Sequence, residues 1–324
     1  MSAFTLTRQL PVDATIAALR ADATVGLTAN PKWLPPKWFY DARGSELFEE
    51  ITRLPEYYPT RAERAILERV APDIAAATGA RTLAELGSGS SEKTRLLIEA
   101  LREHGTLQTY LPIDVSESAL EQAGRALLAD YPGLNVHGLV ADFQAELSLP
   151  DSAAPRLLAF LGGTIGNLRP AERAAFLKTV RTALGPHDAL LLGTDLVKDE
   201  RVLVAAYDDA AGVTAEFNKN VLSVLNRELG ADFDPDDFDH VALWDRDEEW
   251  MEMRLRARRP LGVKVPALDL KVDFARGEEI RTEVSAKFRQ AGVRRELAAA
   301  GMELAEWWTD PQGRFALSLA RPAR

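Results

Sequence analysis

The sequence predicts an α/β protein, with a parallel sheet covered by helices on both faces, a C-terminal antiparallel hairpin, and a second α+β domain. Two observations lead to this prediction. From about residue 61, short apolar segments alternate with amphipathic segments of helical periodicity; residues 197–286 then interrupt that alternation with helices followed by longer strands of alternating polarity. Short apolar strands that alternate with helices are typical of a parallel sheet that is buried on both sides.

The first sixty residues carry short helical patterns that several prolines interrupt. One helix is expected to begin near Ser45, because apolar residues at positions 47, 48, 51 and 54 share one helical face. We therefore assign residues 1–60, together with 197–286, to the second domain, and residues 61–196 with 287–324 to the domain that contains the parallel sheet.

The alternating region predicts five strands and the helices between them. The expected strands are 81–86, 110–114, 135–140, 156–161 and 189–194. The expected helices are 64–77, 92–103, one that starts near Ser116, and 170–184. Ser118 and Glu121 have the spacing of a capping box for the third of these helices.

After residue 195 the pattern changes. Residues 197–230 are predicted to be helical and residues 240–288 to form strands. A last helix over 288–300 is expected to end at Gly301, a residue that suits a helix C-terminus. Two strands over 302–308 and 314–320, joined by a turn at 310–313, then predict the closing hairpin.

Composition excludes several classes of protein. The chain has 324 residues, no cysteine and a formal net charge of −10. Without cysteine there is no disulfide framework and no zinc–thiolate site, and the four histidines lack metal-ligand spacing, so we expect no metal. The acidic balance disfavours nucleic acid as a partner. Because the apolar runs are strand-sized and the first 24 residues lack an apolar core, we expect a cytoplasmic protein with neither a membrane span nor a secretory signal. We also expect a monomer.

The most informative stretch runs from Leu83 to Thr94 and reads LAELGSGSSEKT. Glycines directly after a strand let the backbone turn tightly and let a ligand approach closely. A phosphate-binding loop would need glycine where Glu92 stands, so a nucleoside triphosphatase is rejected. The third glycine of a dinucleotide motif is also replaced by Glu92, which weakens NAD or FAD without excluding them. S-adenosylmethionine, which has no phosphate, suits this loop better.

Two aspartates follow the next strands. Asp114 ends the second strand, where its carboxylate is suited to accept both ribose hydroxyls, and Asp142 follows the third, with Phe143 beside the expected adenine. A lone aspartate at such a place more often caps the next helix. The glycine loop with both aspartates at successive strand ends favours the adenosyl ligand instead.

The chain also resembles a known family, the histidine Nα-methyltransferases that open ergothioneine biosynthesis, over nearly its whole length. The segments that carry the resemblance are LPPKWFYD at 34–41, LPEYYPTR at 54–61, ELGSG at 85–89 with EKT at 92–94, LG at 161–162 with TIGNL at 164–168, YDDAAGVT at 207–214, and EVS at 283–285 with KF at 287–288. Most of these lie outside the glycine loop that methyltransferases share. The expected elements are in turn the arrangement of a class I methyltransferase, a Rossmann-like fold.

The resemblance implies a role for individual residues. It implies that the methyl donor, S-adenosylmethionine, is held by Gly87, Lys93, Asp114, Asp142 and Phe143. It implies that the amino-acid head of the substrate, L-histidine, is held by Tyr57, Asn167 and Tyr207, and that Met253, Glu283 and Ser285 surround the imidazole.

The chemistry of these residue types agrees with such roles. Asn167 offers a donor and an acceptor, so it can orient an amine and a carboxylate together. Glu283 and Ser285, two apart on an expected strand, share a face and suit the two imidazole nitrogens. The other interpretation is a solvated strand face, since Arg281 and Lys287 continue the same alternation. Met253 is equally compatible with plain core packing, and Trp38 and Tyr40 with packing or with a lid.

The expected reaction is Nα-trimethylation of L-histidine to hercynine, with S-adenosylhomocysteine as the second product. A sulfonium is a strong electrophile, so we expect positioning by Asn167 and Tyr40 and no dedicated base. Small residues such as Gly162 leave room for the added methyls. The alternatives are methylation of another amino acid such as tryptophan, a nucleotide-dependent oxidoreductase, and an inactive donor-binding protein.

Overall fold

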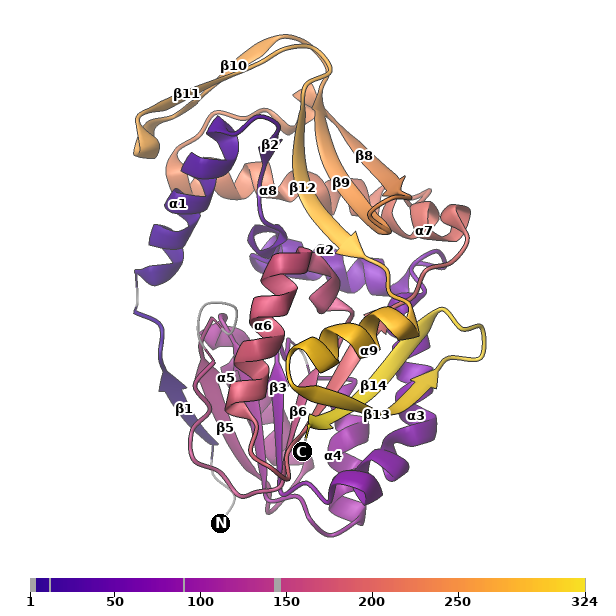
Figure 1. Ribbon diagram of the computed structural model, residues 1–324. Coiled ribbons are helices and arrows are strands. Elements are labelled where there is room, and N and C mark those ends of the chain that lie inside the picture. The colour runs from indigo at the N-terminus through magenta and orange to yellow at the C-terminus, as the bar shows by residue number, and fades with distance from the viewer. Residues whose placement is uncertain (1–3, 12, 90, 143–146, 324) are drawn as a thin grey trace. The chain divides into compact units, whose positions relative to one another are not determined.

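The chain divides into two compact units in the computed structural model, which describes residues 4–11, 13–89, 91–142 and 147–323 (Figure 1). Unit 1 comprises residues 1–11, 59–196 and 288–324, and unit 2 comprises residues 12–58 and 197–287. The expected division assigned the whole N-terminal segment to the second domain. Residues 1–11 instead belong to unit 1, because the strand β1 (Phe4–Arg8) pairs with the sheet of that unit.

Unit 1 is built on one sheet with the strand order β1-β5-β4-β3-β6-β7-β14-β13. Its further strands are β3 (Thr82–Leu86), β4 (Thr109–Asp114), β5 (Asn135–Val140), β6 (Arg156–Phe160), β7 (Ala189–Asp195), β13 (Met302–Thr309) and β14 (Phe315–Pro322). The pairs from β1 to β7 are parallel, and β14 is antiparallel to both β7 and β13. The predicted parallel sheet with an antiparallel C-terminal hairpin is confirmed.

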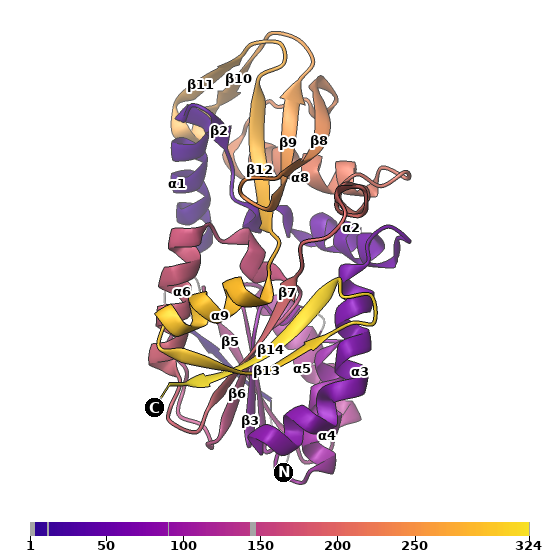
Figure 2. The same cartoon turned by 45° about the vertical axis from the view of Figure 1, so that its right-hand side comes forward.

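Helices cover both faces of this sheet, as Figure 2 shows, with α3 and α4 on one side and α6 and α9 on the other. The helices of unit 1 are α3 (Pro59–Thr78), α4 (Thr94–Glu103), α5 (Glu117–Asp130), η2 (Thr164–Asn167, a 3₁₀ turn), α6 (Pro170–Ala183) and α9 (Gln290–Ala299). Burial on both faces explains why β3 and β7 are buried along their whole length and carry no polar–apolar alternation.

Unit 2 is an α+β unit whose main sheet has the order β2-β12-β9-β8. Its strands are β2 (Lys32–Trp33), β8 (Phe238–Asp245), β9 (Trp250–Ala257), β10 (Leu261–Val265), β11 (Leu270–Phe274) and β12 (Glu279–Ala286). Its helices are α1 (Ala14–Thr28), η1 (Pro36–Phe39), α2 (Ala42–Arg53), α7 (Glu200–Tyr207), α8 (Val213–Leu229), η3 (Pro235–Asp237) and η4 (Pro266–Leu268). β10 and β11 form a separate two-stranded ribbon.

α5 starts next to Ser116, as expected, but its cap differs from the expected one, and α2 starts earlier than expected. α5 is capped by Ser116, whose hydroxyl accepts from the Ala119 amide at 3.3 Å, so the expected capping box at Ser118 and Glu121 is wrong. α2 begins earlier than Ser45, because the Asp41 carboxylate caps it by accepting from the Gly44 amide at 2.8 Å. In the described part of the chain, no helix combines the length and the apolarity that a membrane crossing requires.

Candidate functional site

The glycine loop lies at the carboxyl end of β3, where the sequence places it. Gly87 and Gly89 have φ angles of 67° and 49°, a left-handed region that side chains with a Cβ rarely adopt. The Gly87 amide donates to the Ile113 carbonyl at 2.8 Å, so the loop folds against the end of the neighbouring strand β4. The loop therefore presents backbone without side-chain bulk at this edge of the sheet.

A cluster of buried, hydrogen-bonded polar side chains packs against the loop. Glu85 accepts a hydrogen bond from the Thr94 hydroxyl at 2.5 Å and another from the Tyr110 hydroxyl. The Tyr110 and Ser91 hydroxyls lie 2.8 Å apart, so the two ends of the loop share one network. Burial raises the pKa of Glu85 to about 7, against the lowering effect of these two hydrogen bonds. Glu85 thus has a structural role beneath the loop.

Asp114 and Asp142 come together at the ends of adjacent strands. The Ala141 amide donates to the Asp114 carbonyl at 3.1 Å, which brings the residue before Asp142 against the end of β4. One Asp114 carboxylate oxygen accepts from the Ser116 amide at 2.9 Å and the other from the Gly89 amide at 3.3 Å. Burial raises the pKa of the Asp114 carboxyl. The hydrogen bonds from these amides lower the pKa and offset the increase only in part. Phe143, the expected neighbour of the adenine, lies outside the described residues.

Lys93 lies beside the loop that follows β6. Its ammonium pairs with Glu63 of α3, a carboxylate that is 0% exposed. The same carboxylate accepts from the Gly162 amide at 2.8 and 3.0 Å. Glu63 therefore connects an expected donor-binding residue with an expected substrate residue inside unit 1. The sequence analysis missed Glu63; the signal was a glutamate on the buried face of a helix that also carries Ile66, Leu67 and Val70.

These residues suit an adenosyl group better than a phosphate. The Glu63 carboxylate pairs with Lys93 at the end of the loop, so it takes up the positive charge that a phosphate would need there. The Ser88 hydroxyl in the loop is buried and has no hydrogen-bond partner among the described residues, so it remains for a ligand. The Asp114 carboxylate lies against the loop, where it accepts from the Gly89 amide at 3.3 Å. S-adenosylmethionine fits this combination of an open glycine backbone, a carboxylate and an ammonium group.

A β-bulge in β12 determines which side chains share a face in unit 2. Register shifts between Arg281 and Glu283, so that Glu283 lies opposite Met253, and Ser285 opposite Met251, while Arg281 lies opposite Arg254. The extra residue moves Arg281 to the other face, where it pairs with Glu252. The sequence alternation that grouped Arg281 with Glu283 and Ser285 is therefore broken.

Two of the substrate residues expected in unit 2 are hydrogen-bonded to each other, and Tyr40 feels the charges of this group. The Tyr207 hydroxyl donates to the Ser285 hydroxyl at 2.7 Å, and both residues are buried. Half of the Tyr40 surface is exposed, yet its pKa is raised, first by burial of the phenol among protein atoms and then by the charges of Glu283 and Tyr207. Tyr40 thus belongs with Glu283 and Tyr207.

Tyr57 joins this group through an aromatic contact. Its ring lies 6.0 Å from that of Phe48, whose ring lies 5.5 Å from that of Tyr40. Of the expected substrate residues, Tyr57, Tyr207, Met253, Glu283 and Ser285 lie in unit 2, and Gly162 and Asn167 lie in unit 1. The Trp38 indole N–H donates to the Asp22 carboxylate at 3.0 Å.

Lys287 is a second residue that the sequence analysis did not assign to the site. Its ammonium donates to the Ser285 hydroxyl at 2.8 Å and to the Tyr207 hydroxyl at 2.9 Å. Lys287 is 4% exposed, which is rare for lysine. The signal was present in the spacing, because Lys287 continues the two-residue alternation of Glu283 and Ser285.

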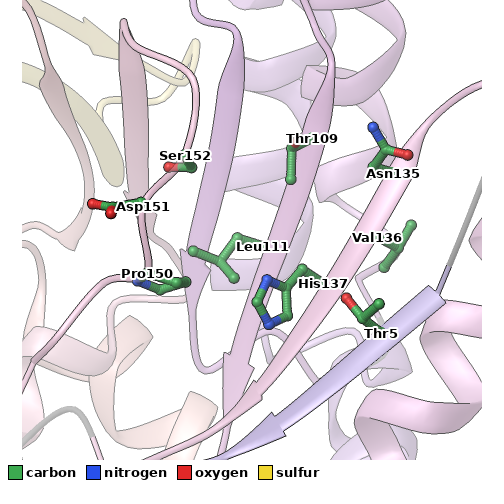
Figure 3. Close-up of a pocket in the computed structure, with 9 residues that line it drawn as sticks. All are labelled: Thr5, Thr109, Leu111, Asn135, Val136, His137, Pro150, Asp151 and Ser152. Carbon is green, nitrogen blue, oxygen red and sulfur yellow. The ribbon is translucent and has the colours of Figure 1, made fainter.

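A cavity of about 270 Å³ in unit 1 lies away from these residues. Its lining includes Thr109 and Asn135, the first residues of β4 and β5, and His137 (Figure 3). Asp114 ends β4, so the cavity lies toward the opposite edge of the sheet from the glycine loop. It is therefore separate from the candidate donor site.

Comparison with known proteins identifies the family of the chain. The model of the family described as histidine-specific methyltransferase, SAM-dependent, matches residues 19–322. The histidine N-alpha-methyltransferase of Mycolicibacterium smegmatis is 58% identical over 315 residues, which cover 97% of this chain and 98% of that protein. The enzyme of the same name from Mycobacterium tuberculosis is 55% identical over 308 residues, covering 95% and 96%. Ergothioneine biosynthesis protein 1 of Neurospora crassa is 33% identical over 290 residues, covering 86% of this chain and 32% of that protein. The chain belongs to the family of SAM-dependent, histidine-specific methyltransferases.

Proposed function

We propose that the protein transfers three methyl groups in succession from S-adenosylmethionine to the α-amine of L-histidine, giving hercynine and S-adenosylhomocysteine. The proposal rests on one observation: Glu283 and Ser285 lie on the same face of β12, and the Ser285 hydroxyl is held by a hydrogen bond from Tyr207. A carboxylate and a hydroxyl are suitable partners for the two nitrogens of an imidazole. Membership of the histidine-specific family supports the same substrate.

The methyl donor is assigned to the glycine-loop edge of unit 1. Gly87 lets the donor approach the backbone, Asp114 accepts its ribose hydroxyls, and Asp142 and Phe143 contact its adenine. Lys93, whose charge is held in place by Glu63, attracts the carboxylate of the donor's methionine part. Bound there, S-adenosylmethionine supplies an electrophilic methyl group on a sulfonium.

The amino-acid head of histidine is assigned to Tyr57, Asn167 and Tyr207. Tyrosine hydroxyls donate to a carboxylate, and the Asn167 amide orients the amine through its carbonyl oxygen. Gly162, next to Lys93, leaves volume for the methyl groups that accumulate on the nitrogen: a Cβ added there would lie 3.8 Å from the Lys93 ammonium. Met253 is buried beside Glu283, where it packs against the imidazole ring.

No dedicated base is required. The attacking amine must be neutral and aligned with the methyl group, and alignment alone contributes ~7–11 kcal/mol through proximity and orientation. The raised pKa of Tyr40 keeps its phenol protonated at neutral pH, so Tyr40 is suited to steer the amine and unsuited to accept its proton. Asn167 and Tyr40 are therefore positioning residues.

Mass spectrometry of the protein incubated with histidine and S-adenosylmethionine tests the proposal. We expect a product that has gained three methyl groups, and no such gain with tryptophan. If tryptophan is methylated and histidine is not, the substrate is tryptophan and the proposal is wrong.

Glu283→Ala tests the assignment of the imidazole contact. Loss of a hydrogen bond to a charged group should lower kcat/KM for histidine roughly 10- to 100-fold and leave the affinity for S-adenosylhomocysteine unchanged. Glu248→Ala, which removes an exposed glutamate of the same unit, is the matched control and should change neither. An unchanged kcat/KM in Glu283→Ala would remove Glu283 from the substrate site.

A further inference from the structure

Three side chains form a closed hydrogen-bonded triangle at the end of β12. The Tyr207 and Lys287 side chains donate to the Ser285 hydroxyl oxygen at 2.7 and 2.8 Å, and Lys287 also donates to the Tyr207 oxygen at 2.9 Å. The three residues are between 4% and 9% exposed, and the backbone amide of Lys287 is fixed by the Glu249 carbonyl at 2.8 Å. The geometry of Ser285 is therefore set by its neighbours.

The triangle determines the direction of the Ser285 proton. A serine oxygen can accept two hydrogen bonds and donates one. The bonds from Tyr207 and Lys287 occupy both acceptor positions, so the Ser285 proton points away from both of them. A lysine ammonium has three protons and no acceptor, so a charged Lys287 keeps one acceptor position of Ser285 occupied, and the Tyr207 hydroxyl occupies the other. Ser285 consequently presents a hydrogen-bond donor to a ligand.

We propose that Lys287 is a specificity-determining positioning residue that makes Ser285 a donor, so that the site binds the neutral imidazole of histidine and rejects the imidazolium. This inference rests on the proposed function. A neutral imidazole has one N–H and one nitrogen lone pair, which match an accepting Glu283 and a donating Ser285. An imidazolium carries N–H groups at both nitrogens, and one of them would face the Ser285 proton. The Lys287 ammonium, one hydrogen bond away, also opposes a second positive charge.

Other titratable and charged groups surround this face of the sheet. Glu283 alone would favour the imidazolium, and Lys287 opposes it. Tyr40 stays protonated and neutral. His240 of β8 bonds to the Tyr207 carbonyl and to Asn218 of α8, and burial lowers its pKa, so it is neutral near pH 7. The charged groups of β9, Glu252, Arg254 and Arg256, lie on the opposite face of the sheet in ion pairs. Asp209, near His240, is engaged as the cap of α8.

The proposal predicts a pH-dependent affinity. An imidazole has a pKa of about 6.5, so at pH 5.5 roughly one histidine in ten is neutral. The dissociation constant of histidine should therefore rise about tenfold between pH 8 and pH 5.5. Triazolylalanine, whose ring stays neutral over this range but keeps an N–H and a lone-pair nitrogen, is the matched ligand. It shares the α-amine and the carboxylate, so the ratio of the two dissociation constants isolates the ring.

Calorimetric titration of each ligand into protein saturated with S-adenosylhomocysteine tests this directly. In the unaltered protein, the ratio of the histidine to the triazolylalanine dissociation constant should rise about tenfold from pH 8 to pH 5.5. A ratio that stays flat while histidine binds would overturn the inference and leave the proposed function intact. Failure of histidine to bind at any pH, with S-adenosylhomocysteine bound, would instead count against the proposed function.

Two variants separate the role of Lys287 from general stability. Lys287→Met frees one acceptor position on Ser285, so Ser285 can turn and accept from an imidazolium; the tenfold rise should shrink to less than about threefold. Lys287→Arg keeps the charge and the donors and should retain most of the rise. A steep rise that persists in Lys287→Met would show that Lys287 does not orient Ser285. If Lys287→Met does not fold, the ratio of the two dissociation constants in the unaltered protein still shows whether the site prefers the neutral imidazole. Loss of the tenfold rise in Lys287→Arg would then overturn the role of Lys287.

Discussion

Replacement of Glu85 by glutamine tests the polar cluster beneath the glycine loop. Glu85 is 4% exposed and bonded to Thr94 and Tyr110, and its pKa is raised from 4.5 to about 7. The folded protein therefore holds a proton that the unfolded chain releases between pH 4.5 and pH 7. Because the folded state binds more protons in this window, the free energy of unfolding falls as the pH rises through it.

The size of the effect follows from the shift. About 2.5 pKa units correspond to about 3 kcal/mol of stability that is present below pH 4.5 and lost above pH 7. Glu85→Gln removes this ionisation. Its amide keeps the bond from Thr94 and donates to Tyr110, which in turn can donate to Ser91. The variant should therefore gain stability relative to the unaltered protein as the pH rises.

Urea unfolding at pH 5, 6, 7 and 8 measures this difference. The stability of Glu85→Gln minus that of the unaltered protein should rise by roughly 2–3 kcal/mol from pH 5 to pH 8. Glu92→Gln, at an exposed position of the same loop, is the control and should show no such trend. If this difference in stability does not change with pH, Glu85 is ionised in the folded protein throughout the range. If the difference decreases as the pH rises, the folded protein lowers the pKa of Glu85 and does not raise it.

Three further outcomes are expected. Gly87→Ala places a Cβ at a φ of 67°, which costs ~1–2 kcal/mol and should weaken S-adenosylhomocysteine binding about tenfold by calorimetry; unchanged affinity would separate the loop from the donor site. Glu63→Ala leaves the Lys93 ammonium and the Gly162 amide without their buried acceptor and should lower the free energy of unfolding by roughly 3–5 kcal/mol in urea, and a loss below about 1 kcal/mol would contradict the described pair. Thr282→Val removes the bond to the Asn218 side chain at 2.6 Å and should lower the stability by ~1–3 kcal/mol, with an unchanged thermal midpoint as the contrary result.

The fold could be predicted largely from local patterns. Strands such as β3 and β7 are mostly apolar and buried along their whole length, and their length and spacing indicate a parallel sheet. β1 was not expected, because only five residues form it and its pairing with β5 depends on a partner more than 120 residues away. The cap of α5 was assigned two residues late, because Ser116 and Ser118 are both good caps and only the backbone geometry distinguishes them.

In the candidate site, too, some residues can be predicted from local sequence patterns and others cannot. Strand-end residues such as Gly87 and Asp114 follow from the order of the strands, because carboxyl ends of parallel strands meet at one edge. The ion pair of Glu63 with Lys93 and the hydrogen bond of Lys287 to Tyr207 join residues far apart in the sequence, so local periodicity does not reveal these partners. The bulge between Arg281 and Glu283 was equally invisible, since one extra residue inverts the faces without changing the polar–apolar pattern.

The central claim is that the edge formed by Gly87 and Asp114 holds an adenosyl sulfonium compound and excludes a dinucleotide. Calorimetric titration of S-adenosylhomocysteine and of NAD into the protein and into Asp114→Asn measures this most directly. We predict saturable binding of S-adenosylhomocysteine, weakened roughly 10- to 100-fold in Asp114→Asn by loss of charge-assisted bonds to the ribose, and no binding of NAD. Binding of NAD at this edge with none of S-adenosylhomocysteine would contradict the account.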